Sequence, residues 1–128
     1  MTGDRVDLRL VATSDAAPVA RGAVGDLARA AGASPNVLQD VVLAVSEAVT
    51  NVVLHAYPPG ADGEVRIHAS DQDDELHVLV ADDGSWQTRP DSAREHFGLR
   101  LIERCAAAHR LVPGQKGSRV LMRFDLEA

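Results

Sequence analysis

The sequence predicts an α+β fold, a two-layer sandwich in which three helices cover one face of a mixed, mainly antiparallel sheet. Strand-like alternation of apolar and polar residues occurs near the N-terminus and again through the second half of the chain. Helix-like spacing of apolar residues fills the stretch between and returns once later. The resulting order, β-α-α-β-β-α-β-β, keeps helices and strands segregated, which is typical of a two-layer α/β sandwich.

The N-terminal part of the chain reads as one strand followed by one helix. Residues 6–11 alternate apolar and polar side chains with period two, as a half-buried strand does. Ser14 or Asp15 is a suitable N-cap, and Pro18 falls in the first turn of the helix that follows, where proline is tolerated. Gly32 is the expected end of this helix.

A second helix is predicted to begin at Ser34-Pro35 and to end before the Pro-Pro-Gly at residues 58–60. Its apolar stripe consists of Leu38, Val41, Val42, Val45, Val49 and Val52. Glu47, Asn51 and His55 are spaced four residues apart, so they form one ridge beside that stripe. The helix can therefore bury one side and present a polar row on another.

A β-hairpin is predicted next, from residues 64–70 and 75–82. Apolar and polar residues alternate in both segments. A four-residue turn at 71–74 places Ile67 opposite Val78 and brings the apolar residues of both strands to one face. The second strand ends at an Asp-Asp-Gly sequence.

The C-terminal part predicts one more helix and one more hairpin. A polar loop at residues 84–95 is followed by a helix that is expected to open at Phe97-Gly98 and to run to Ala106. Leu111-Val112 and residues 120–126 form the last hairpin, with glycines in its turn.

Composition limits the kinds of function. With 128 residues, 45% apolar and 25% charged, the chain predicts a single soluble domain, residues 1–128. A net charge of −6 argues against nucleic acid or an anionic membrane as the main partner and suits a basic protein partner. The single cysteine, Cys105, cannot form an internal disulfide. No apolar run approaches a membrane span and no signal peptide opens the chain, so we expect a cytoplasmic protein.

Glu47 and Asn51 are the first candidate functional residues in the chain. A carboxylate such as that of Glu47 can take a proton from a hydroxyl group as it attacks phosphorus. Asn51, one helical turn later, offers a neutral oxygen to Mg²⁺, which prefers few protein ligands together with phosphates and waters. Each residue taken alone is an ordinary feature of a helix surface.

The end of the predicted hairpin and the start of the third helix supply further candidates. Asp82 could accept a hydrogen bond from the exocyclic amine of a purine, and Gly84 would let the backbone approach the ring. Gly98 would offer free amides and the positive end of a helix dipole to phosphate oxygens. An ordinary turn and an ordinary helix start are the alternatives.

Two other polar groups do not predict a metal site. His68 and His77 would face each other across the hairpin, but two ligands do not make a zinc site. Residues 71–74 lack the glycine and the distal glutamate of a calcium-binding loop. Asn51 remains the one metal ligand that we expect.

Four short segments, in their order and spacing, resemble the motifs of the Bergerat-fold (GHKL) ATPases, the superfamily of gyrase, heat-shock chaperone, histidine kinase and mismatch-repair ATP domains. The segments are Glu47-Ala48-Val49-Thr50-Asn51 with His55-Ala56-Tyr57, then Asp82-Asp83-Gly84, Gly98-Leu99-Arg100-Leu101-Ile102 and Gly117-Ser118-Arg119-Val120. The resemblance covers nearly the whole chain. Within the superfamily, the chain looks most like the anti-sigma-factor serine kinases of bacterial partner-switching systems.

The resemblance implies roles for individual residues. Glu47 would be the catalytic base, Asn51 the magnesium ligand and Asp82 the adenine contact. Ser118 stands where a threonine near the adenine is more usual. The residues that the resemblance assigns to nucleotide binding are Asn51, Asp82, Gly84, Gly98, Leu99 and Ser118.

The resemblance also implies cofactors and partners. Family members use ATP and Mg²⁺ to phosphorylate a serine on a STAS-type anti-anti-sigma protein, and in the alternative state they bind a sigma factor. They usually act as homodimers, with no direct contact to nucleic acid or membrane. The same analogy places the sigma-factor contact on the first helix, near Arg21.

The chain departs from the family pattern around the third motif. Trp86 stands where a glycine is usual, and a histidine replaces the first of two glycines before the third helix. The segment 85–96 is short and carries no lysine, which leaves Arg89, Arg94 or Arg100 to contact a γ-phosphate. Two functions therefore stay open: an active kinase, or a non-catalytic binding module with the same fold.

Overall fold

The computed structural model describes residues 5–85, 93–112, 114 and 116–127, and within residues 93–98 it describes the backbone alone. The elements are β1 (Arg5–Val11), α1 (Ala16–Ala30), α2 (Pro35–Asn51), η1 (Val52–Ala56), β2 (Glu64–Gln72), β3 (Glu75–Asp82), α3 (Ala93–Cys105), β4 (Ala108–Val112) and β5 (Arg119–Asp125).

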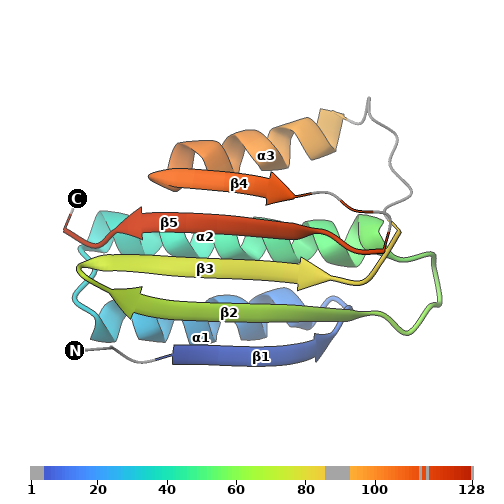
Figure 1. The fold of residues 1–128 in the computed structure, drawn as a ribbon, viewed down its shortest axis with the longest axis horizontal. Helices are drawn as coiled ribbons and strands as arrows, with labels where there is room; N and C mark the ends of the chain where they lie inside the picture. The colour runs from blue at the N-terminus through green and yellow to red at the C-terminus, as the bar shows by residue number, and fades with distance from the viewer. Residues whose placement is uncertain (1–4, 86–92, 113, 115, 128) are drawn as a thin grey trace.

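The strands form one sheet in the order β1-β2-β3-β5-β4, and the three α-helices lie together on one side of it (Figure 1). All four strand pairings are antiparallel, so the expected mixed sheet has no parallel pair among the described strands. α2 packs against β3, β5 and both other helices, and α1 covers β1 and β2. The two-layer α+β fold predicted from the sequence is confirmed.

The core lies between the helices and the sheet. Alternate residues of the inner strands point into this layer and are almost fully buried, while their neighbours face the open side. The largest fully buried side chains are Phe124, Ile67, Leu76, Ile102, Val24, Val41, Val45, Val49, Val65 and Val80. The apolar faces predicted for both the second helix and the hairpin therefore meet in one core.

The start of α2 and the end of α1 follow the expected capping chemistry, and the start of α1 does not. Ser34 caps α2, and its Oγ accepts a hydrogen bond of 3.2 Å from the amide of Val37. Asp15 occupies the N-cap position of α1 without a side-chain bond. Gly32 has a φ of 94°, the left-handed conformation that lets the chain leave α1 and turn into α2.

The β2–β3 hairpin is shifted by two residues from the predicted register. Ile67 lies opposite Val80 instead of Val78, and the turn contains only Asp73 and Asp74, with φ values of 52° and 64°. A two-residue turn in which both residues have a left-handed backbone conformation matches the twist of the strands that it connects. Aspartate tolerates this conformation. A shift by two keeps every side chain on its predicted face.

The revised register also separates the two histidines of the hairpin. His68 lies opposite Leu79, and His77 lies opposite Ser70, so the two imidazoles are not directly paired. Among the residues that the structure describes, no group of three or more His, Cys, Asp or Glu side chains is arranged to hold a metal.

The second helix ends before Pro58, as predicted, but its last residues are not α-helical. After Asn51 the chain continues as a π-helix, η1, in which hydrogen bonds run from residue i to i+5. Of the three residues predicted to form one ridge, Glu47 and Asn51 lie in α2 and His55 lies in η1. π-helical turns inside α-helices are frequent at functional sites.

The α2–η1 segment has the predicted length, but it is more apolar than we expected from the sequence. Residues 35–56 form 22 continuous helical residues, and an 18-residue window within them has a mean hydropathy of 1.6, which meets the length and composition of a membrane span. Its Val41, Val45 and Val49 are fully buried against the other helices and the sheet. We therefore interpret it as the central helix of the core.

Candidate functional site

The predicted site residues gather at the end of the sheet where β3 ends and β5 begins, beside the end of η1 (Figure 1). Three polar residues are buried in the described core, namely Asn51, Asp82 and Ser118, and all three are predicted site residues. Burying a polar side chain is costly unless it is hydrogen-bonded, so their common location marks this end of the molecule.

Asp82 is the centre of the site. Its side chain lies on the helix-covered side of the sheet, and the residue is only 3% exposed. Oδ1 accepts a 2.9 Å hydrogen bond from the amide of Gly84, and Oδ2 accepts a 2.7 Å bond from the Ser118 hydroxyl. The Asp82 amide donates to the Ser118 carbonyl at 3.1 Å. The carboxylate is therefore fixed from two elements that are distant in sequence.

Two glycines allow this close packing. A Cβ on Gly84 would lie 2.0 Å from the carbonyl oxygen of Ala56, the last residue of η1. A Cβ on Gly117 would lie 2.2 Å from the carbonyl oxygen of Asp82, and Gly117 has a φ of 135°. Gly84 thus makes room for the end of η1, whereas the sequence predicted room for a ring. Gly117 was quoted in a motif but was not among the predicted site residues.

Tyr57 ties the helical layer to the same strand end. Its hydroxyl donates a 2.5 Å hydrogen bond to the carbonyl of Glu64 and accepts a 3.0 Å bond from the amide of Asp83. A Cβ on Gly63 would lie 2.2 Å from the tyrosine ring. No sequence pattern predicts this contact, because it joins the end of a helix to two strand termini.

Asp83, unlike Asp82, points toward solvent and forms an ion pair with Arg66, with 2.7 Å between the nitrogen and the oxygen. The hydrogen bond from the Arg66 guanidinium lowers the pKa of the Asp83 carboxyl below its usual value of 3.8. The pKa of Arg66 is raised by the same bond. The two adjacent aspartates therefore have separate roles, one buried in the site and one on the surface.

Glu47 and Asn51 lie on the last turns of α2, which leads through η1 to the contact with Gly84. Asn51 is the final residue of α2 and is 8% exposed, whereas Glu47 is half-buried. Their placement one turn apart is as the sequence predicted. Asn51 is therefore largely shielded from solvent, and Glu47 keeps access to water.

The predicted phosphate-binding amides are placed differently. α3 begins at Ala93, so Gly98 and Leu99 lie in its second turn, where a backbone amide is bonded within the helix. The expectation of a helix start at Phe97-Gly98 is wrong, because the preceding residues, from Ala93 onward, continue the helix. The free amides of α3 belong to its first turn. Trp86 and Arg89 lie outside the described residues, and Arg100 is exposed.

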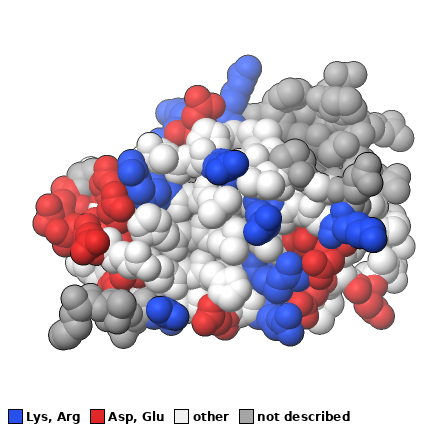
Figure 2. Space-filling model, in the orientation of Figure 1, with Lys and Arg blue, Asp and Glu red and all other residues white. Residues whose placement is uncertain are grey.

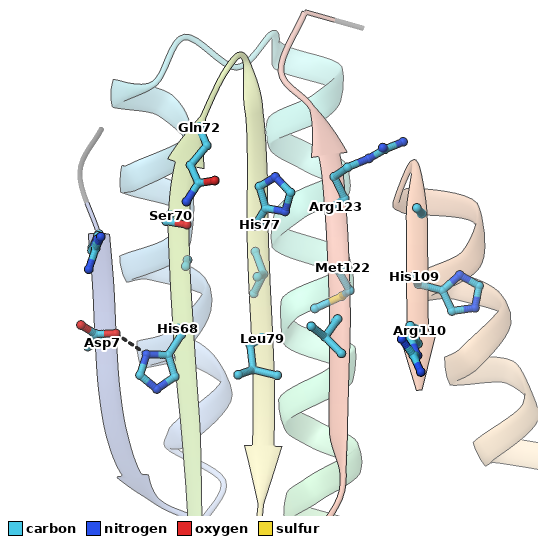
Figure 3. Close-up of a pocket in the computed structure, with 15 residues that line it drawn as sticks. Asp7, His68, Ser70, Gln72, His77, Leu79, His109, Arg110, Met122 and Arg123 are labelled. Carbon is cyan, nitrogen blue, oxygen red and sulfur yellow. Dashed lines mark hydrogen bonds and ion pairs between the residues drawn. The ribbon is translucent and has the colours of Figure 1, made fainter. Parts of the chain in front are cut away.

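A separate hollow of about 420 Å³ lies on the open face of the sheet (Figure 3). Its lining includes Leu79 and Leu121, with Asp7 and His68 hydrogen-bonded to each other at one side. Figure 2 shows basic side chains around a mainly uncharged centre, with acidic side chains gathered at the left end and a second acidic group beside the basic side chains toward the right. None of the predicted site residues lines this hollow.

Comparison with known proteins agrees with the fold and the motifs. A family model described as the histidine kinase-like ATPase domain matches residues 10–124, which include every predicted site residue. The chain belongs to the histidine kinase-like ATPase family. The resemblance that was inferred from the four motifs is therefore confirmed.

Relatives within the family are named as anti-sigma factors and serine kinases. The anti-sigma F factor of Clostridium novyi is 28% identical over 141 residues, covering 100% of this chain and 99% of that protein. The anti-sigma F factor of Clostridium beijerinckii is 30% identical over 80% of each protein. The serine-protein kinase RsbW of Listeria innocua is 35% identical over 82 residues, an alignment that spans 64% of this chain and 52% of the kinase.

Solved structures show the same fold. The RsbU and RsbW domains of Rv1364c from Mycobacterium tuberculosis match 96% of this chain with a TM-score of 0.79 and 25% identity. The chain spans 32% of that longer protein. A histidine kinase domain from Erythrobacter litoralis matches with a TM-score of 0.60 at 22% identity, a likeness of fold alone.

Proposed function

We propose that this ATPase-family protein is an ATP-dependent protein serine kinase and anti-sigma factor. In one state it phosphorylates a serine of a STAS-type anti-anti-sigma protein, and in the other it sequesters a sigma factor. We further propose that it works in the cytoplasm as a homodimer of the 1–128 domain. The names of its relatives support the regulatory role, and the buried Asp82 supports nucleotide binding.

The buried Asp82 is the single observation that carries the proposal. Each of its carboxylate oxygens accepts a hydrogen bond from the protein, and an ionised carboxylate acts only as an acceptor. Such a carboxylate suits the exocyclic amine of adenine, because an amine presents only donors at that position. Ser118 and Gly84 hold the carboxylate in place. The residues present therefore fit a purine nucleotide at this end of the sheet.

The other assignments follow from position on α2. Asn51 would offer its carboxamide oxygen to Mg²⁺, which neutralises charge on the phosphates when it is bound. Glu47, half-buried and one turn earlier, would take the proton of the incoming serine hydroxyl. The free amides in the first turn of α3 suit the phosphates, and Gly98 and Leu99 could serve only if α3 began later in the bound state.

Calorimetry of Mg²⁺-dependent ATP binding tests the nucleotide site. The wild type should bind ATP, and Asn51→Ala should weaken binding by at least about tenfold, since a ligand to the metal is lost. Asn36→Ala is the matched control, because Asn36 is exposed at the opposite end of α2. Absence of binding by the folded wild type would reject the nucleotide site.

A phosphotransfer assay with a STAS-domain protein tests the kinase. Glu47→Ala should lower transfer by about 10²–10⁴-fold, the usual contribution of a general base, and leave ATP affinity within about twofold. Glu127→Ala, an exposed carboxylate beyond β5, is the control. Retained transfer by Glu47→Ala would show that Glu47 is not the base.

The position of α3 favours a second candidate, a non-catalytic binding module of the same fold. In this module the nucleotide would be structural or absent, because Gly98 has no free amide to offer a phosphate. Sigma-factor binding in the absence of any phosphotransfer would identify the module. Transfer that depends on Glu47 would exclude it.

A further inference from the structure

Tyr57 occupies the junction between the helical layer and the sheet. It follows the last residue of η1 and has an extended backbone, with φ −126° and ψ 148°. Its ring lies where a side chain on Gly63 would be, since a Cβ there would approach ring atoms to 2.2–2.4 Å. The close approach of Gly63 restricts the position of the ring, and the hydroxyl group therefore lies at a defined position.

The two hydrogen bonds of the hydroxyl use its donor and acceptor in complementary ways. A phenol has one proton to donate, and here that proton goes to the carbonyl of Glu64 at 2.5 Å. A lone pair is then directed at the amide of Asp83, 3.0 Å away. Exchanging the roles is impossible, because a carbonyl only accepts and an amide only donates.

The amide of Asp83 belongs to the peptide group that follows Asp82. The amides on either side of it are already fixed around Asp82, one by the Ser118 carbonyl and the other, that of Gly84, by the Asp82 carboxylate. The Tyr57 hydroxyl holds the amide between them. Three consecutive amides thus have fixed directions, and the direction of the Asp82 carboxylate depends on all three.

We propose that Tyr57 is a positioning residue for nucleobase recognition, which acts through the peptide after Asp82 without touching the nucleotide. The inference rests on the proposed function, in which Asp82 accepts a hydrogen bond from the purine amine. Its specific consequence concerns selectivity between purines. Loss of the hydroxyl loosens the carboxylate and lowers the preference for a base that carries the amine over one that lacks it.

The test compares ATP with inosine triphosphate, whose base has a carbonyl in place of the amine. Affinities of both nucleotides are measured by calorimetry for the wild type and for Tyr57→Phe, which removes the hydroxyl and keeps the ring. The ratio of the two affinities should fall about three- to tenfold in the variant, the range expected for one lost hydrogen bond. A uniformly destabilised protein would lose both affinities together and keep the ratio.

Arg66→Gln is the matched control. It removes the ion pair on the Asp83 side chain and leaves the bond from the Asp83 amide to Tyr57 intact. The nucleotide ratio of this variant should stay within about twofold of the wild type, since exposed ion pairs contribute little. A ratio that falls as far as in Tyr57→Phe would assign the effect to general loosening of the turn and overturn the proposal.

Two further outcomes separate this inference from the proposed function. A wild type that binds ATP and inosine triphosphate equally would reject the adenine contact of Asp82, and the role of Tyr57 with it. A wild type that prefers ATP, with the same preference in Tyr57→Phe, would reject only the role of Tyr57.

Amide exchange on the wild type provides a test that needs no variant. The Asp83 amide should be protected, and ATP should increase its protection more than inosine triphosphate does. Exchange of Asp83 as fast as that of exposed Asp62 would reject the hydrogen bond on which the inference stands.

Discussion

The hydroxyl of Ser118 donates a 2.7 Å hydrogen bond to Oδ2 of Asp82, although the two residues are 36 positions apart in the chain. Both residues are less than 10% exposed, and the bond connects the start of β5 to the end of β3. A buried carboxylate that loses such a donor keeps its desolvation cost. The pair is therefore sensitive to removal of a single oxygen atom.

Ser118→Ala removes that oxygen. We expect the free energy of unfolding to fall by about 1–3 kcal/mol, the usual cost of leaving a buried acceptor with one donor fewer. Urea denaturation measures the change, and ATP affinity should fall in parallel. Ser118→Thr keeps the hydroxyl and serves as the control, so equal stability of the alanine and threonine variants would contradict the expectation.

Gly84→Ala tests the contact between β3 and η1. Its Cβ would lie 2.0 Å from a backbone oxygen of Ala56, so either backbone must move, and we expect a loss of about 1–3 kcal/mol in stability. Gly22→Ala is the matched control, since no atom lies within 4 Å of the added carbon in α1. That change should stabilise the protein by about 0.5–1 kcal/mol. Thermal unfolding that ranks the two variants in the opposite order would refute the contact.

Asp74→Gly tests the hairpin turn. Asp74 has a φ of 64°, a conformation that glycine adopts without steric cost, so the variant should gain about 0.5–1 kcal/mol in stability. Asp71→Gly, within β2, should lose a similar amount, because glycine is unfavourable inside a strand. Chemical denaturation measures the change in stability of both variants. A loss of stability in Asp74→Gly would argue for the longer turn predicted from the sequence.

The ion pair of Arg66 with Asp83 predicts a pH dependence. The pKa of Asp83 is lowered in the folded state, so its contribution is complete above the unfolded value of 3.8 and disappears as the pH falls through the folded value. The stability difference between wild type and Arg66→Gln should therefore be small but constant from about pH 7 to 5, and should vanish at lower pH. A stability difference between the two proteins that grows as the pH falls would contradict the lowered pKa of Asp83.

Cys105 should react slowly. Burial, aided by the carboxylate of Asp40, raises the pKa of its thiol above 9.0, so at pH 8 less thiolate is present than in an unfolded chain. We expect iodoacetamide to alkylate the native protein more slowly than the urea-unfolded protein, and Asp40→Asn to speed the native reaction. Equal rates in native and unfolded protein would contradict the shift.

Local rules predicted most of the fold. The cap of α2 at Ser34, the end of α1 near Gly32 and the inward face of the hairpin all depend on residues close together in sequence. The predicted position of Asp82 at a strand end is also a local feature. Asp82 and Ser118 are both buried, and their direct bond could not be read from either motif alone.

The sequence-based predictions were wrong where the structure depends on contacts between residues that are distant in sequence. A hairpin shifted by two residues buries the same face, so hydrophobic pattern alone could not choose between the turn at 71–74 and that at Asp73 and Asp74. The sequence predicts the start of α3 at Phe97-Gly98, whereas the helix begins at Ala93. The π-helical turn of η1 and the contacts of Tyr57 leave no periodic signal at all.

β5 lies between β3 and β4 in the sheet, although it is the last of the described strands in the chain. While the chain emerges from a ribosome, β3 therefore keeps an open edge until the segment that begins with Ser118 arrives. An open edge of a half-built sheet is a template for wrong pairing with other chains. Under the proposed function, the donor that fixes the purine-binding carboxylate arrives with the strand that closes this gap. Under that function, a newly made chain would gain nucleotide binding at the step in which β5 covers the open edge of β3.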